Sequence, residues 1–246
     1  MAVSRFNEHG QPIGEPVEWA PRRAPARVPL AGRHVILQPV DAAAHARQLW
    51  ESLCGPDDAS LWTYRPEEPP VDVTAMRERV AAWALGAGHL TWALVPTATG
   101  RACGVASFFG IDPLHGSVEV AAVLFSRRLQ RTREATEAIA LLAAYAFDDL
   151  GYRRLEWKLD ALNAPSAAAA RRFGFRYEGR FRNAMVYKGR NRDTDWFAMT
   201  DDEWRLLRPA YDAWLAPENF DEEGQQRTRL SDLTASGDRP DPVQDR

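Results

Sequence analysis

The chain has 246 residues, of which 45% are hydrophobic and 26% are charged, and this composition is typical of a soluble globular protein. A formal net charge of -3 argues against broad electrostatic capture of nucleic acid, and no apolar run reaches the length of a membrane span. The two cysteines, Cys54 and Cys103, form no CxxC motif and no Cys/His cluster, which argues against a disulfide scaffold and a structural zinc site. We therefore expect a cytoplasmic protein that uses no metal and binds neither nucleic acid nor membranes.

The two ends of the chain differ in composition from its middle. Residues 1–29 contain five prolines and little apolar periodicity, which predicts an extended N-terminal arm. Residues 216–246 are rich in polar and charged side chains and poor in large apolar ones, which predicts a disordered, solvated tail. The compact domain is therefore expected over residues 30–215.

The first half of this domain predicts a strand, two helices and three further strands. Asp41 stands at the position of a helix N-cap. The connections between the last three strands are too short for a parallel arrangement, so these strands are expected to form an antiparallel meander. In chain order, the expected ranges are a strand at 33–40, helices at 42–53 and 74–85, and strands at 91–95, 102–111 and 117–125.

The second half alternates helices and strands. Thr200 and Glu203 have the spacing of a capping box, which predicts the start of a final helix. The expected ranges before it are a helix at 133–149, a strand at 154–160, a helix at 165–172, and strands at 175–181 and 194–199. This order predicts an α/β or α+β fold built on one mixed sheet.

One segment has the features of an anion site. The strand at 117–125 passes through a tight loop into the long helix, whose first amides and positive dipole end favour a negatively charged ligand. Four arginines stand in seven residues of this loop: Arg127, Arg128, Arg131 and Arg133. A polyphosphate site and a solvated basic corner are both compatible with this local pattern.

Two motifs make the pattern more specific. The loop that Gln130 opens precedes the long helix, and Asn163-Ala-Pro-Ser166 precedes a helix that Gly174 closes. With the preceding meander, residues 30–205 resemble the GCN5-related N-acetyltransferase (GNAT) family, in its RimJ/RimL-like branch of ribosomal-protein N-terminal acetyltransferases. The resemblance implies a single domain with a mixed, mostly antiparallel central sheet flanked by helices. It also implies that the strands at 117–125 and 154–160 splay apart.

The resemblance further implies that acetyl-CoA binds in this gap as a co-substrate. Arg133 stands where the family usually has glycine, and we expect its side chain to form a charged fork for phosphate oxygens instead. The pantetheine arm is expected along Val123, Leu124 and Phe125, with Asn163 as a side-chain contact. The pyrophosphate is expected on the loop and helix start, namely Gln130, Arg131, Thr132, Arg133, Glu134, Ala135 and Thr136.

Glu119 is the candidate general base, because an acid within an apolar strand is costly unless it is paired or functional. Strand alternation places Glu119, Ala121 and Val123 on one face and Leu124 on the other. The oxyanion donor is expected to be a main-chain N–H near Leu124. The alternative is that Glu119 only forms a salt bridge with an arginine.

Ser166 is the candidate hydrogen-bond donor to the leaving sulfur, and the alternative is a helix cap. The position where many relatives have a catalytic tyrosine is Ala170.

Trp62 and Tyr64, in the loop between the first two helices, are candidates for an aromatic wall of the acceptor pocket. The alternative is that they pack this loop onto the core. Taken together, the sequence predicts an acetyl-CoA-dependent N-acetyltransferase acting on a primary amine, as a monomer or homodimer. A protein or peptide N-terminus, an amino acid and a small amine all remain open as acceptors. The competing hypothesis is a non-catalytic binding or sensor module that has lost productive acetyl-CoA binding.

Overall fold

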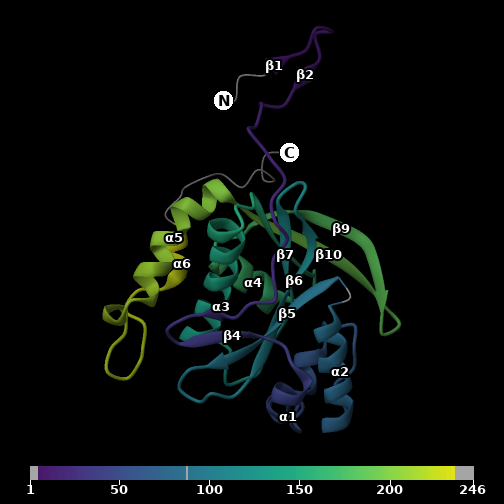
Figure 1. The fold of residues 1–246 in the computed structure, drawn as a ribbon, viewed down its shortest axis with the longest axis vertical. Helices are drawn as coiled ribbons and strands as arrows, with labels where there is room; N and C mark the ends of the chain where they lie inside the picture. The colour runs from purple at the N-terminus through teal and green to yellow at the C-terminus, as the bar shows by residue number, and fades with distance from the viewer. Residues whose placement is uncertain (1–4, 87, 236–246) are drawn as a thin grey trace.

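An eight-stranded sheet organises the computed structural model, which describes residues 5–86 and 88–235. Its strand order is β3-β4-β5-β6-β7-β8-β10-β9, and β7 with β8 is its parallel pair, whereas the other neighbours are antiparallel (Figure 1). The strands are β3 (Leu30–Ala31), β4 (Val35–Pro39), β5 (His89–Pro96), β6 (Gly104–Asp112), β7 (Ser117–Phe125), β8 (Arg154–Asp160), β9 (Arg176–Tyr187) and β10 (Arg190–Thr200). The expected mixed, mostly antiparallel sheet is confirmed.

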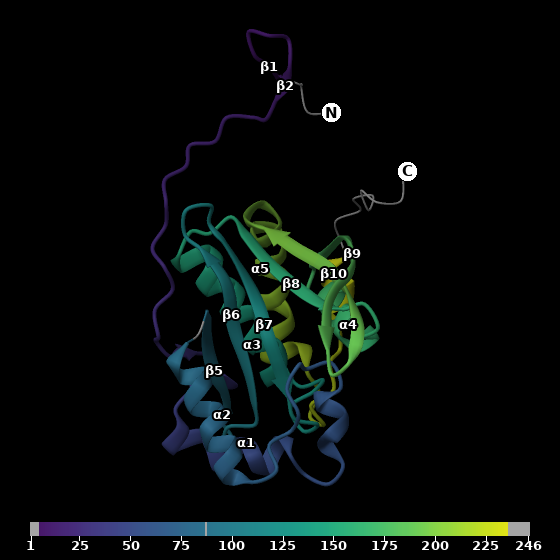
Figure 2. The same ribbon diagram turned by 90° about the vertical axis from the view of Figure 1, so that its right-hand side faces the viewer.

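Helices cover both faces of this sheet (Figure 2). One core cluster joins the first two helices to β5, β6 and Leu124 of β7. The other cluster joins α3 and α5 to Val118 and Val120 of β7 and to the apolar residues of β8. The helices are α1 (Ala42–Leu53), α2 (Val73–Leu85), α3 (Arg133–Ala144), α4 (Ala164–Arg172), α5 (Asp201–Leu215) and α6 (Leu230–Thr234).

Local capping explains where several of these helices begin. Asp41 accepts a hydrogen bond from the amide of Ala44 at the start of α1 (2.8 Å). At the start of α5, the Thr200 side chain and the Glu203 carboxylate satisfy each other's backbone amides, as the capping-box spacing predicted.

Two elements are longer or differently shaped than expected. The strands expected at 175–181 and 194–199 continue into one long hairpin, β9–β10, which turns at Lys188 and Gly189. Both turn residues have positive φ, 49° and 69°, as a tight two-residue hairpin turn requires. Most β9 residues beyond 179 are exposed, so apolar alternation could not mark this part as a strand. The helix expected at 133–149 changes to a π-helical turn over Tyr145–Asp149.

The N-terminal arm has two parts. A small hairpin of β1 (Arg5–Phe6) and β2 (Pro12–Ile13) extends away from the domain (Figures 1 and 2). From Trp19 onward the arm lies along the domain, where the Trp19 indole donates to the carbonyl of Leu114 (2.7 Å) and the Ala26 amide donates to the hydroxyl of Tyr145 (2.8 Å). Residues 1–4 of the expected arm lie outside the described residues.

The expectation of a solvated tail from residue 216 is wrong for residues 217–235. This segment forms a short 3-10 turn at Pro217–Asn219, a bridge between Phe220 and Gln226, and α6. Leu230 is fully buried in the core cluster with α5. A few widely spaced apolar residues are enough to anchor the segment, and their spacing leaves no periodicity in the sequence. The expected tail from 236 to 246 lies outside the described residues.

We expect Leu230→Ala to lower the free energy of unfolding by roughly 2–5 kcal/mol, because truncating a fully buried leucine loses apolar burial and leaves a cavity. Leu206→Ala is the matched control, since Leu206 lies on α5 with 63% of its surface exposed, and its effect should stay within about 0.5 kcal/mol. Urea unfolding of both variants measures the difference. Equal stabilities would show that residues 217–235 do not pack on the domain.

Candidate active site

The parallel strands β7 and β8 separate after three residues. They pair through Ser117 with Arg154, Val118 with Leu155, and Glu119 with Glu156, and no pairing continues beyond Glu119 among the described residues. β7 nevertheless runs on to Phe125 and β8 to Asp160. The backbone of each strand therefore faces its neighbour without a ladder partner over its second half. The expected splay is confirmed.

A β-bulge at Ala122 changes which way the second half of β7 faces. Ser107 of β6 opposes Ala121, but Val105 opposes Leu124, so β7 holds one extra residue, and Ala122 has a positive φ of 53°. The expectation from strict alternation is therefore wrong. Val123 packs towards the cluster of α3, whereas Leu124 packs into the cluster of α1 and α2, on the face that Glu119 and Ala121 share.

The pairing of β7 with β6 also determines which amides of β7 face the gap between β7 and β8. The Ser126 amide donates to the carbonyl of Cys103, next to β6 (3.1 Å). Successive residues of an antiparallel strand direct their backbone groups to opposite sides. Leu124 lies two residues before Ser126, so its amide also points to β6. Val123 and Phe125 therefore present their amides to the gap. The Gln130 side chain lies on that side, where its Nε2 donates to the carbonyl of Phe125 (3.0 Å).

The loop after β7 leads into the N-terminus of α3. Thr132 is the N-cap, and its side chain accepts from the Ala135 amide (3.2 Å). Arg131, with a φ of 64°, is the left-handed residue of the loop, and Arg133 is the first helical residue. A glycine at position 133 is thus not needed for its conformation. The amides of Arg133 and Glu134 donate to no acceptor among the described residues, as is usual in the first turn of a helix.

The side chain of Arg133, which was expected to bind phosphate oxygens, contacts the C-terminal segment. Its guanidinium lies 4.2 Å from the ring centre of Phe220, in the C-terminal segment, as a cation–π contact. Arg127 also turns away from the helix start and donates to Asp58 (3.1 Å). Thr136 is buried, and its hydroxyl accepts from both terminal nitrogens of Arg172. Arg127 and Arg133 therefore make these contacts away from the amides at the start of α3.

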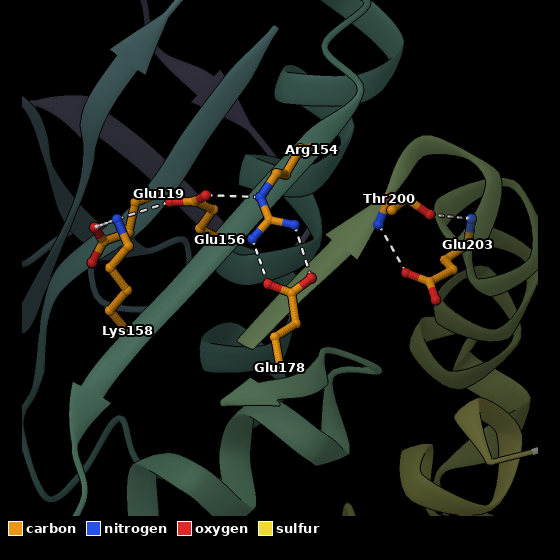
Figure 3. A network of polar contacts seen from close by, with 7 residues as sticks. All are labelled: Glu119, Arg154, Glu156, Lys158, Glu178, Thr200 and Glu203. Atoms are coloured by element: carbon orange, nitrogen blue, oxygen red, sulfur yellow. Dashed lines mark hydrogen bonds and ion pairs between the residues drawn. The ribbon is translucent and has the colours of Figure 1, made fainter. Parts of the chain in front are cut away.

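Glu119 belongs to a charged network that crosses from β7 to β8 (Figure 3). Its carboxylate lies 3.1 Å from the ammonium of Lys158, which also contacts Glu156 at 2.8 Å. Glu156 in turn accepts from Arg154 (2.7 Å). The alternative that Glu119 pairs with an arginine identified the right kind of contact but the wrong residue, because Lys158 is its partner.

Burial and charge act in opposite directions on Glu119. Burial raises the pKa of its carboxyl above the usual value, and the nearby ammonium of Lys158 only partly offsets this effect. For Lys158, burial favours loss of the proton, but the carboxylates of Glu156 and Glu119 outweigh it and raise the pKa of the amine. Glu119 is therefore a stronger base than an exposed glutamate, beside a lysine that stays charged.

Asn163 and Ser166 meet at the start of α4, close to the end of β8. The Asn163 side-chain oxygen caps the helix by accepting from the Ser166 amide (3.2 Å), which leaves its NH₂ group for other contacts. The hydroxyl of Ser166 accepts from the indole N–H of Trp157 (3.0 Å). Asn163, and not Ser166, is therefore the cap, and the Ser166 hydroxyl keeps its own proton for donation.

The two aromatic candidates have different surroundings. Trp62 is only 1% exposed and belongs to the core cluster of α1 and α2, where its indole donates to the carbonyl of Leu53 (2.9 Å). The expectation that Trp62 lines an acceptor pocket is therefore wrong, because the core already surrounds it. Tyr64 is half-buried and bridges to the loop before α4 through a hydrogen bond to the carbonyl of Leu162 (2.9 Å).

A cavity of about 270 Å³ adjoins the bulge of β7, and sequence reasoning did not find it. Ala122 lines it together with residues from the loop before α2, from α2 itself and from β5 and β6. Its polar lining consists of Arg65, Glu67, Arg79, His89, Thr91 and Ser107. The strand expected at 91–95 left out His89, which is the first residue of β5, and the cavity depends on elements that only the tertiary fold brings together.

Comparisons with known proteins agree with this geometry. A family model described as an acetyltransferase (GNAT) domain matches residues 34–176. A crystal structure of a GCN5-related N-acetyltransferase from Brucella melitensis is 40% identical, with a TM-score of 0.87 over 89% of this chain and 99% of that one. A probable acetyltransferase of the GNAT family from Chromobacterium violaceum ATCC 12472 is 39% identical, with a TM-score of 0.73 over 78% of this chain and 97% of that one. The chain belongs to the GNAT acetyltransferase family.

A curated relative supports the RimJ/RimL-like branch. It is named "Putative ribosomal N-acetyltransferase YdaF", from Bacillus subtilis (strain 168), and is 26% identical over 105 residues. The match spans 43% of this chain and 57% of that protein's length.

Within residues 5–86 and 88–235, no group of three or more metal-ligating side chains is arranged to hold an ion. No helix in the same part of the chain has the length and apolarity of a membrane-spanning segment.

Proposed function

We propose that the protein transfers the acetyl group of acetyl-CoA to a primary amine by direct attack in a ternary complex. The observation that carries this proposal is the separation of β7 from β8, together with the unpaired amides at the start of α3, the helix that follows β7. A thioester-bearing arm needs a backbone edge with which to pair, and a diphosphate needs amides at a helix start. The chain provides both next to each other, and its family membership supports acetyl-CoA as the donor.

In this proposal, main-chain groups hold most of the coenzyme. The pantetheine arm pairs with the gap-facing backbone of Val123 and Phe125 and accepts a hydrogen bond from the free NH₂ group of Asn163. The pyrophosphate binds the amides of Arg133 and Glu134, with exposed Arg131 as an additional charge. Two observations support this role of the Arg133 amide: the residue has no positive φ, and its side chain contacts Phe220.

The chemistry requires a neutral amine, a donor for the oxyanion and a leaving thiolate. The amine nitrogen bonds to the thioester carbon, and the tetrahedral oxyanion accepts from the gap-facing amide of Val123. Its collapse breaks the C–S bond and releases the CoA thiolate. Glu119 accepts the proton that the amine loses, directly or through water. Ser166 donates its hydroxyl proton as a hydrogen bond to the departing sulfur.

Calorimetry with acetyl-CoA and a free-thiol assay with a panel of amines test this function. We expect binding in the micromolar range, release of CoA thiol that depends on the amine, and a mass increase of one acetyl group on the acceptor. The panel contains a peptide N-terminus, free amino acids and small amines, so it also identifies the acceptor class. Absence of binding at millimolar acetyl-CoA would contradict the proposal and favour a non-catalytic module.

We expect Thr132→Ala to weaken acetyl-CoA binding about fivefold, because loss of an N-cap costs about 1 kcal/mol and frees the loop that positions the amides. Arg133→Ala should change the dissociation constant less than about threefold, since its side chain contacts Phe220 and not the helix start. Calorimetric titration of both variants measures the two effects. A large loss of acetyl-CoA affinity in Arg133→Ala, with no loss in Thr132→Ala, would show that the Arg133 side chain and not the Thr132 cap supports binding.

Glu119 should determine the acidic limb of the kcat–pH profile. Only its carboxylate form accepts a proton, so activity falls as pH decreases through its raised pKa. Lys158→Met removes the positive charge that holds this pKa down, and the acidic limb should therefore move to higher pH. Glu119→Gln should lower kcat by about 10²–10⁴-fold, the usual contribution of a general base, and remove the limb.

A kcat–pH profile in Glu119→Gln that matches the unaltered protein would exclude Glu119 as the base. Lys188→Met serves as the control for loss of a lysine, because Lys188 pairs with Glu68 and not with Glu119.

Ser166→Ala should lower kcat by about 3- to 10-fold, since the CoA thiol, with a pKa near that of cysteine (about 8.5), needs little help to leave. Trp157→Phe serves as the comparison. It removes the indole donor to Ser166 but keeps the hydroxyl, so its effect should be smaller than that of Ser166→Ala. Steady-state kinetics at saturating acetyl-CoA measures both, and an unchanged kcat in Ser166→Ala would remove this residue from the chemistry.

A further inference from the structure

The cavity beside Ala122 adjoins the part of β7 on which the thioester of the proposed complex would lie. Ala122 is the bulge residue of β7, next to the gap-facing amide of Val123, and it forms part of the cavity wall. The hydroxyls of Thr91 and Ser107 share a hydrogen bond of 2.8 Å in the same wall. A group bound in the cavity would therefore lie next to the reacting atoms of the proposed ternary complex.

The charges that line this cavity do not balance. Glu67 accepts two hydrogen bonds from Arg65, through Nε at 3.2 Å and Nη2 at 3.1 Å. The Nη1 atom of Arg79 forms an ion pair with the same carboxylate at 3.7 Å, which is too long for a hydrogen bond. One carboxylate thus faces two guanidinium groups, and Glu67 is the only acidic side chain in the described lining. Arg65, Arg79 and Glu67 together therefore give the cavity lining a net charge of +1.

One donor of this group is also unsatisfied. The Nη1 atom of Arg79 is buried and has no hydrogen-bond partner among the described residues. Arg65 is only 8% exposed, whereas the side chains of Glu67 and Arg79 are each 28% exposed at the cavity. His89, the other titratable group of the lining, adds no compensating negative charge, and burial together with Arg65 lowers its pKa and keeps it neutral. The Arg79 Nη1 donor thus has a charge partner in Glu67 but no hydrogen-bond acceptor in the described part of the chain, and a carboxylate bound in the cavity would supply one.

We propose that this cavity binds a carboxylate of the acceptor, so that the protein selects primary amines that also carry an acidic group. Arg79 is the specificity-determining residue, and its Nη1 donates to the bound carboxylate. Two sources of the carboxylate share this chemistry: the α-carboxyl group of a free amino acid and an acidic side chain near the N-terminus of a peptide. The proposal rests on the proposed acetyl transfer, because it names the acceptor of that same site.

Binding of acetylated product analogues tests the proposal without requiring turnover. Two matched pairs distinguish the sources: N-acetylserine against N-acetylserinamide, and the amidated peptides acetyl-Ser-Glu-Ala against acetyl-Ser-Gln-Ala. Calorimetry is performed on the free and on the CoA-loaded protein. We expect the carboxylated member of one pair to bind at least about tenfold more tightly, and the pair that shows this difference identifies the source. Equal affinities within both pairs would overturn the proposal.

Three variants connect that preference to the cavity. Arg79→Gln should reduce the preference to less than about threefold, whereas Arg77→Gln, at an exposed position of the same helix, should retain it. Glu67→Gln should strengthen binding of the carboxylated member, because it removes the carboxylate that competes for the two guanidinium groups. Such a gain in affinity cannot result from a loss of structure. A preference that survives Arg79→Gln, or a loss of affinity in Glu67→Gln, would contradict the assignment.

Turnover of the corresponding free amines separates this proposal from the proposed function. Selective binding without acetylation of any amine would contradict acetyl transfer and leave the carboxylate site standing. Acetylation that does not distinguish acidic from neutral acceptors would overturn the carboxylate site and leave acetyl transfer standing.

Discussion

The separation of β7 from β8 is the constraint on which the site depends. Backbone amides inside a sheet are normally paired, and an unpaired buried amide is costly unless another partner satisfies it. β7 is paired with β6 on both sides of the bulge at Ala122, its other edge has no strand partner beyond Glu119 among the described residues, and β8 is paired with β10. The sheet is therefore stable although its middle is open. A ligand that donates and accepts along an extended arm can complete it.

Main-chain and side-chain groups around this opening make different contributions to the site. The start of α3 and the gap-facing edge of β7 contribute amides, which no single side-chain substitution removes. Side chains contribute the charges, in the pair of Glu119 with Lys158 and in the pair of Arg79 with Glu67. Arg133, at a position where the family resemblance led us to expect glycine, has an ordinary helical backbone conformation. Its side chain contacts Phe220 of a segment that also packs on the core.

Much of the fold was predictable from the sequence because its signals are local. Asp41, Thr200 with Glu203, and the short turns of the meander each specify a boundary through neighbouring residues. The bulge could not be predicted, because alanine has no preference for positive φ and the strand around it is uniformly apolar. That bulge reverses the faces of Val123 and Leu124, so alternation failed there.

The partners of the candidate residues depended on tertiary contacts. Lys158 reaches Glu119 only because the two strands are parallel and in register at Glu156. Trp62 has an aromatic side chain of the kind that often lines binding pockets, but the core between α1 and α2 encloses it. The cavity needed the loop before α2 to lie over β5 and β6, and no periodicity in the sequence indicates that arrangement.

Amide hydrogen exchange of β7 with and without acetyl-CoA tests the opening most directly. In the free protein, the amides of Val123 and Phe125 should exchange faster than that of Leu124, which faces β6. Saturating acetyl-CoA should slow Val123 and Phe125, together with Arg133 and Glu134 at the start of α3, and leave Leu124 unchanged. Exchange at all five positions that is unaffected by the coenzyme would contradict a ligand bound between the diverging strands.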